Sequence, residues 1–132
     1  MHFLLISAVC AVSAAIIGGL WYSPQVFGKT WAKLAGVDLK DKSGASVRML
    51  YSFLANIALA VTLYSIAEWS QAYGVRSGMV MGILLGFGVV MMSMMLPYMW
   101  EKRSPKLFMI NASYQVIVII TMSMIITSLA KL

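Results

Sequence analysis

Four apolar stretches fill most of this chain and restrict what it can fold into. Each is close to the length of about 20 residues that a helix needs to cross the hydrocarbon core of a bilayer. The segments between them hold nearly all of the charged residues. The sequence therefore predicts an all-α protein with four transmembrane helices, at about residues 3–21, 49–68, 78–99 and 107–130.

The composition indicates a single membrane domain. Of the 132 residues, 61% are hydrophobic and 11% are charged, well outside the usual balance of soluble domains. The length leaves no room for a second globular unit, so residues 1–132 are expected to form one integral membrane domain. The net charge of +6 lies beside the spans, which favours anionic lipid headgroups as partners over nucleic acid.

The distribution of basic residues predicts an orientation. The first and third connections carry Lys29, Lys33, Lys40, Lys42, Arg48, Lys102, Arg103 and Lys106, and the remaining basic residues are Arg76 and Lys131. This distribution of eight against two places the first and third connections in the cytoplasm and both termini outside. We expect the membrane to be a bacterial inner membrane, with residues 3–21 as a first transmembrane helix rather than a cleaved signal peptide.

The first connection has the pattern of a short amphipathic helix. Ser23 is a suitable N-cap, Pro24 is a suitable first helical residue, and Phe27 and Trp31 follow about one turn apart. We therefore expect an interfacial helix that starts at Pro24, between the first and second spans, in the cytoplasmic headgroup region. A re-entrant turn is the alternative, because Gly28 weakens a helix.

The pattern Ser-Pro-x-aliphatic-Phe occurs twice in the chain, at residues 23–27 and again at residues 104–108. Each copy begins just beyond a tryptophan at the end of a span. Two related helical hairpins would produce such a repeat, as in some transporters. Coincidence, or shared interface chemistry without duplication, explains it equally well.

Two spans carry ladders of small residues at a spacing of four. The first span has Ser7, Ala11, Ala15 and Gly19, and the third has Gly78, Gly82 and Gly86. Such ladders let helix backbones approach closely, which matters because lipid supplies no hydrophobic drive between helices. We interpret the ladders as packing within the chain. They also fit an interface between copies, and a homo-oligomer is expected.

Polar side chains from three spans fall at one depth. With a rise of about 1.5 Å per residue, Asn56, Ser93, Asn111 and Gln115 lie roughly 7–14 Å from the nearest charged residue of the cytoplasmic connections. A carboxamide that faces lipid is costly, so these side chains are expected to face protein or a cavity. The layer either lines a small polar cavity for a ligand or solute, or forms ordinary hydrogen bonds between helices.

The residues offer little support for catalysis or cofactor chemistry. No carboxylate or histidine lies deep in a span, so we expect neither an enzyme nor a proton-coupled carrier. Cys10 is the only cysteine, which excludes a disulfide framework. Met91, Met95 and Met99 form a stripe of soft ligands suited to Cu(I), but core packing explains them more simply. No metal and no cofactor are predicted.

A sequence motif follows the first span. Residues 21–31 read Trp21-Tyr22-Ser23-Pro24-Gln25-Val26-Phe27-Gly28-Lys29-Thr30-Trp31. This stretch resembles the Trp-Tyr-Ser-Pro-x-x-Phe-Gly-x-x-Trp signature of the domain-of-unknown-function 1761 family of small membrane proteins. The resemblance implies a four-helix membrane domain and no particular activity. It also suggests that Trp21, Tyr22, Ser23, Pro24, Phe27, Gly28 and Trp31 act as a unit.

The leading functional prediction is a small non-enzymatic membrane protein that conducts or binds a small solute through its polar layer. The alternative is a structural or interaction subunit that packs through its ladders against itself or another membrane protein. A cavity between the helices of one chain would favour binding, and a pore on a rotation axis would favour conduction. A solid bundle with one exposed glycine face would favour the structural role.

Overall fold

Helices account for most of the structure. The computed structural model describes residues 2–131, and these contain helices, turns and loops but no strand. In chain order the helices are α1 (His2–Trp21), α2 (Gly28–Ala35), α3 (Ala45–Ser70), α4 (Val75–Ile83), the π-helix η1 (Leu84–Met91), α5 (Met92–Trp100) and α6 (Pro105–Leu129). Four segments of this described chain are long and apolar enough to span a membrane: His2–Trp21, Ala45–Trp69, Val75–Trp100 and Pro105–Leu129. The predicted all-α class with four spanning helices is confirmed.

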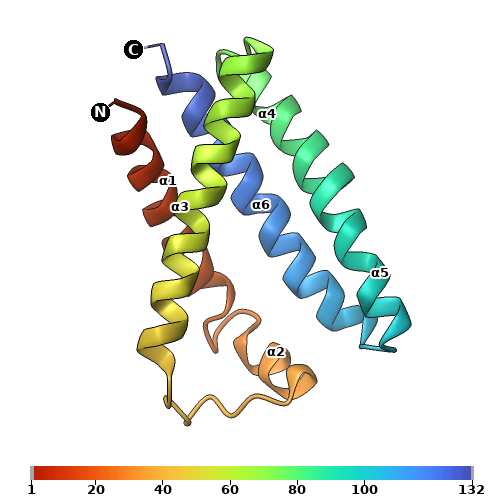
Figure 1. The fold of residues 1–132 in the computed structure, drawn as a ribbon. Coiled ribbons are helices and arrows are strands. Elements are labelled where there is room, and N and C mark those ends of the chain that lie inside the picture. The colour runs from red at the N-terminus through yellow and green to blue at the C-terminus, as the bar shows by residue number, and fades with distance from the viewer. Residues whose placement is uncertain (1, 132) are drawn as a thin grey trace.

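The four long segments run in alternating directions, so the start of α1 and the end of α6 lie at the same end of the bundle (Figure 1). The opposite end carries α2, the loop that follows it, and the turn between α5 and α6. We refer to it as the α2 end. The helix α6 contacts each of α1, α2, α3, α4, η1 and α5. It is therefore the central helix of the bundle.

The apolar core consists of two clusters. The larger includes Ile6, Cys10, Leu63 and Met122, from α1, α3 and α6, and it fills the half of the bundle away from α2. The smaller lies at the α2 end and joins Tyr98, Leu107, Phe108 and Ala112. The ring of Trp31 packs against this smaller cluster and attaches α2 to the bundle.

The predicted methionine stripe is divided between core and surface. Met91 and Met95 pack against the smaller cluster, whereas Met99 is 67% exposed. Two of the three thioethers therefore serve as apolar packing groups, a role for which the flexible methionine side chain is well suited.

The glycine ladder of the third span packs against α6. A Cβ atom added at Gly82 would lie 2.6 Å from Cα of Ile120, and one added at Gly78 would lie 2.7 Å from Cα of Met124. At Gly86 the nearest backbone atom of α6 would be 3.3 Å away. Backbone atoms cannot rotate aside, so the first two positions require glycine for this close approach. The ladder packs within the chain, and its face is covered.

The helix α2 begins later than the sequence predicts. It starts at Gly28, after a turn that includes Ser23 and Pro24, so the predicted start at Pro24 is wrong. The Ser23 hydroxyl donates to the carbonyl of Leu20 at 2.8 Å, and the Ser23 carbonyl accepts from the N–H of Gly28 at 2.9 Å. Ser23 closes a turn instead of capping a helix.

The second Ser-Pro segment folds differently. Oγ of Ser104 accepts a hydrogen bond from the N–H of Leu107 at 3.4 Å, and Pro105 is the first residue of α6. This is the capped helix start that the sequence predicts for residues 23–27. The same sequence pattern therefore produces two different local structures.

Candidate functional site

A groove of about 590 Å³ lies between α1 and α3 at the α2 end; we call it the α1/α3 groove. Arg48, Ser52 and Asn56 line it from α3, and their spacing of four places them on one face of that helix. The other lining residues are Ala11, Ala14, Ala15, Gly18, Gly19, Tyr22, Ala45, Met49, Phe53 and Tyr114. A polar stripe on α3 thus faces a stripe of small residues on α1.

The α1/α3 groove forms because the two helices do not fill the space between them at this end. All residues buried on α3 lie within 60–67, in the half away from α2. The small-residue ladder of α1 is divided in the same way: Ser7 and Ala11 are buried, whereas Ala15 and Gly19 are exposed. The exposed half of the ladder forms one wall of the groove.

A chain of hydrogen bonds stands behind the groove. The Tyr22 hydroxyl donates to Oδ1 of Asn111 at 2.7 Å, and Nδ2 of Asn111 donates to the Tyr98 hydroxyl at 2.8 Å. Tyr22 lies one residue beyond α1. Burial is the largest cause that raises the pKa of Tyr22, and the neighbouring phenols of Tyr114 and Tyr98 raise it further. Its phenol therefore remains protonated and able to donate.

Tyr114 completes the inner wall. Its hydroxyl donates to the carbonyl of Ala14 at 3.2 Å, and its ring packs edge-on against that of Tyr22, with 5.2 Å between the ring centroids. A Cβ atom at Gly18 would come within 2.9 Å of the Tyr114 hydroxyl oxygen, so this glycine makes room for the ring. The wall is aromatic, and both of its hydroxyls bond to protein.

The four residues of the predicted polar layer take different positions. Asn56 lines the α1/α3 groove, and its carboxamide makes no hydrogen bond to any part of residues 2–131. Asn111 lies behind the groove, where both of its amide atoms are bonded. Gln115 is half-buried and Ser93 is exposed. Asn56 and Tyr22 therefore line the same groove, Tyr22 bonds to Asn111 behind it, and Ser93 does not line the groove.

Sequence patterns did not identify several residues of the site. Arg48 and Ser52 carried a usable signal, because with Asn56 they form a polar stripe at a spacing of four. The bond between Tyr22 and Asn111 joins residues 89 positions apart, and no local pattern indicates such a contact.

The signature motif folds onto itself beside the groove. The rings of Trp21 and Phe27 lie 4.9 Å apart, and those of Tyr22 and Trp31 lie 5.3 Å apart, measured between centroids. A Cβ atom at Gly28 would lie 2.8 Å from the carbonyl carbon of Ser23, so only glycine allows α2 to start this close to the turn. The motif positions Tyr22 at the groove and Trp31 in the smaller core cluster.

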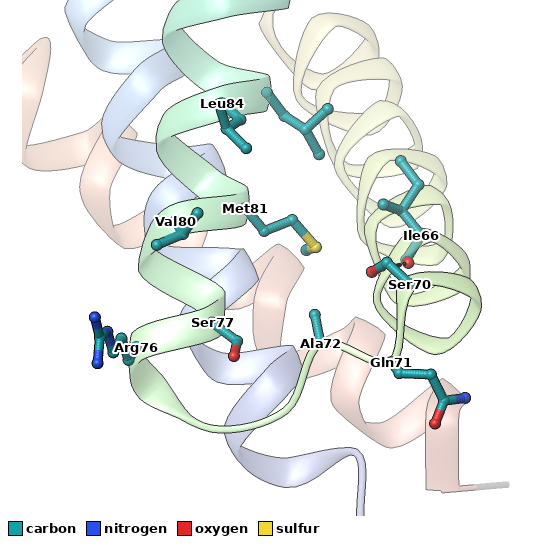
Figure 2. Close-up of a pocket in the computed structure, with 10 residues that line it drawn as sticks. Ile66, Ser70, Gln71, Ala72, Arg76, Ser77, Val80, Met81 and Leu84 are labelled. Atoms are coloured by element: carbon teal, nitrogen blue, oxygen red, sulfur yellow. Dashed lines mark hydrogen bonds between the residues drawn. The ribbon is translucent and has the colours of Figure 1, made fainter.

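A second groove, of about 510 Å³, lies between α3 and α4 at the opposite end. Figure 2 shows Ile66 and Ser70 on one side of it and Val80, Met81 and Leu84 on the other. The Ser70 hydroxyl donates to the carbonyl of Ile66 at 2.7 Å, within its own helix. The polar residues of the second groove, Ser70, Gln71, Arg76 and Ser77, come from the end of α3, the α3–α4 connection and the start of α4. In the α1/α3 groove the polar residues instead extend along α3 as far as Asn56, so we place the candidate site there.

The fold and the groove define a small four-helix membrane protein with an opening of ligand size at one end. Within residues 2–131, no three His, Cys, Asp or Glu side chains lie close enough together to hold a metal ion. Residues 5–127 match the family model described as "Protein of unknown function (DUF1761)", and the chain belongs to this family. The predicted membership in this family is thereby confirmed. No curated protein and no solved structure gives a significant match.

Proposed function

We propose that the protein is a non-enzymatic membrane protein that binds a small solute in the α1/α3 groove. The observation that carries this proposal is the free carboxamide of Asn56, which lines a groove between helices of a single chain. A polar group in a membrane protein is costly unless it meets a partner, so an unbonded amide facing a groove favours water or a ligand as that partner.

The lining indicates the chemistry of such a solute. The polar stripe offers a guanidinium at Arg48, a hydroxyl at Ser52 and a carboxamide at Asn56, spread over about 12 Å of helix. Arg48 donates to a neutral acceptor, the carbonyl of Ser43, at 2.9 Å, and its charge also acts on the carboxylate of Asp41 in the preceding loop. We expect a slender solute with an anionic or acceptor-rich end at Arg48 and a less polar part against Ala15 and Gly19.

Binding is favoured over conduction. The larger core cluster, with Ile6, Leu63 and Met122 nearly fully buried, fills the half of the bundle beyond the groove. A solute that entered at the α2 end would meet this apolar packing instead of an aqueous path.

We propose a bacterial inner membrane as the location, with the α2 end in the cytoplasm and both termini outside. The eight basic residues of the first and third connections all belong to the α2 end, against Arg76 and Lys131 at the other. This asymmetry is the basis for the orientation. The groove then lies in the cytoplasmic half of the bundle.

The alternative is an interaction subunit in a homo-oligomer. The exposure of Ala15 and Gly19 supports it, because small residues on an exposed helix face allow a helix of a second copy to approach closely. In this case the α1/α3 groove would be occupied by protein and closed to solutes.

Cysteine reactivity separates these proposals. In a Cys10→Ala background, Ser52→Cys and Asn56→Cys place thiols in the groove, and Ala55→Cys places one on an exposed face at the same depth. Sulfonatoethyl methanethiosulfonate, a water-soluble anionic reagent, should modify positions 52 and 56 in vesicles and leave position 55 unreactive. Equal lack of reaction at all three positions would overturn the proposal.

Two further measurements sharpen the result. With Asn56→Cys, the anionic reagent should react several-fold faster than its trimethylammonium counterpart, and Arg48→Gln should remove this preference. A Gly19→Cys variant that forms a disulfide-linked dimer, with no reaction at position 56, would support the interaction subunit instead.

A further inference from the structure

We propose that the α2 end binds one anionic phospholipid at a site separate from the α1/α3 groove. The site combines a pocket lined by three lysines with an apolar groove that continues from it, and neither shares a lining residue with the α1/α3 groove. We call these two parts the headgroup pocket and the acyl groove.

The headgroup pocket has a volume of about 380 Å³ and lies between α2 and the start of α6. Its lining residues are Lys29, Thr30, Lys33, Leu34 and Lys106. Three ammonium groups and one hydroxyl therefore face a space that no carboxylate lines. Lys29 and Lys33 are four residues apart on α2, where like charges destabilise a helix unless an anion neutralises them. Phosphate oxygens accept hydrogen bonds from all four groups.

The acyl groove, of about 450 Å³, adjoins this pocket and shares Thr30 and Lys106 with it. Its other lining residues are Trp21, Val26, Phe27, Met109, Ile110 and Ser113. Val26 and Met109 are 51% and 50% exposed, so apolar surface is open along this groove. From Lys106 to Ser113 the lining follows α6 for about 10 Å into the span.

The aromatic wall of the acyl groove is held in place by the protein. The indole N–H of Trp21 donates to the carbonyl of Ile110 at 3.0 Å, which ties the end of α1 to α6. The ring of Phe27 packs against that of Trp21, and the N–H of Phe27 donates to the Trp21 carbonyl at 3.1 Å. The wall is therefore formed before any ligand binds.

The continuity of the two parts points to a lipid instead of a free phosphate ester. A soluble phosphate would satisfy the three lysines and leave the apolar groove without an occupant. A phospholipid matches both, with its phosphate at Lys29, Lys33 and Lys106 and the start of one acyl chain between Phe27 and Met109. Basic pockets between helices at a membrane interface are typical sites for anionic lipid headgroups.

Quenching of Trp21 fluorescence by brominated lipid tests this site. The full chain with Trp31→Phe, Trp69→Phe and Trp100→Phe retains only Trp21, and a companion variant retains only Trp69, which is 87% exposed at the opposite end. Both are placed in phosphatidylcholine vesicles that contain a low, equal fraction of either brominated phosphatidylglycerol or brominated phosphatidylcholine. Trp21 should be quenched more strongly by the phosphatidylglycerol, whereas Trp69 should be quenched equally by both.

Matched lysine variants define the site. Lys29→Gln, Lys33→Gln and Lys106→Gln together should remove most of the preference of Trp21 for phosphatidylglycerol. The control changes Lys40, Lys42 and Lys102, with the same loss of charge at the same end, and should retain the preference. Equal quenching of Trp21 by the two lipids, or an equal loss in both triple variants, would overturn the proposal. Release of the quenching by millimolar glycerol phosphate would show that the pocket takes free phosphate esters and would overturn the assignment to a lipid.

Discussion

The hydroxyl of Tyr22 donates to Oδ1 of Asn111 across 89 positions of sequence, at 2.7 Å. The amide nitrogen of Asn111 donates to the hydroxyl of Tyr98. The centroid of the Tyr98 ring also lies 4.2 Å from the guanidinium carbon of Arg103. One carboxamide thus connects the turn after α1 with α5 and α6. Asn111 therefore has a structural role: its hydrogen bonds support the inner wall of the groove that Asn56 lines.

The hydrogen bonds of Asn111 should contribute to stability as a coupled set. Tyr22→Phe and Tyr98→Phe each leave one amide atom without its partner, which should lower the free energy of unfolding by about 1 kcal/mol. In an Asn111→Leu background, each tyrosine change should have a much smaller effect, because the shared acceptor and donor are gone. Unfolding in mixed micelles, read as a double-mutant cycle, measures the coupling. Additive effects would contradict this structural role.

The glycines of the third span should differ sharply in tolerance. Gly82→Ala places a methyl group 2.6 Å from Cα of Ile120, so α4 must move away from α6, and we expect a loss of about 1–3 kcal/mol. Gly88 lies in the same span and has no atom within 4 Å of an added Cβ. Gly88→Ala is the matched control and should be neutral or slightly stabilising. Thermal unfolding in detergent compares the two, and equal stability would show that the packing of α4 on α6 is looser than described.

Gly28 should be essential for the docking of α2. In Gly28→Ala the new methyl group would meet the backbone of Ser23 at 2.8 Å, so α2 should separate from the turn. The ring of Trp31 would then leave the smaller core cluster, which should shift its fluorescence to the red. Gly19→Ala, where an added Cβ meets nothing within 4 Å, is the control and should keep the native spectrum. Unchanged Trp31 emission in Gly28→Ala would contradict the close contact.

The loop before α3 contains a carboxylate whose charge stabilises the local turn. Oδ1 of Asp41 accepts from the N–H of Ser43 at 2.9 Å, and the hydrogen bonds of Ser43, followed by the charge of Arg48, lower the pKa of Asp41. Because the folded pKa is below the unfolded one, this stabilisation is complete at neutral pH and is lost as the pH falls through the lowered value. A carboxyl NMR titration should give a midpoint below that of an unfolded peptide. Ser43→Pro, which removes the N–H donor, should raise it, and an unchanged midpoint would argue against the bond.

The spans could be predicted from hydropathy alone, whereas the local structure after the first span could not. Residues 23–27 and 104–108 share one pattern, yet only Ser104 caps a helix. The difference arises from Gly28, whose missing side chain lets the chain fold back on Ser23 before α2 begins. The contact between Gly28 and Ser23 forms only in the folded conformation of the whole turn. Residue propensities for helix or turn do not describe such a contact.

Counting residues along the spans predicts a common depth for polar side chains, but not the direction in which each side chain points. Counting residues placed Asn56, Ser93 and Asn111 at a similar level, but the rotation of each helix about its axis is set by packing. The π-helix η1 adds a further error, because its turns hold more residues than those of an α-helix and so shift the faces of the residues that follow, including Ser93. The polar stripe of α3 lies on a regular helix, where the spacing of four could have predicted that Arg48, Ser52 and Asn56 share a face.

The central position of α6 has a consequence for biosynthesis. Every helix that α6 contacts precedes it in the chain, so α6 is the last of these helices to be synthesised. Independently inserted helices that associate later fit this order of events. Until α6 arrives, the glycines that it covers remain open to lipid or to insertion factors. The bundle is therefore complete only once α6 has packed against the helices that precede it.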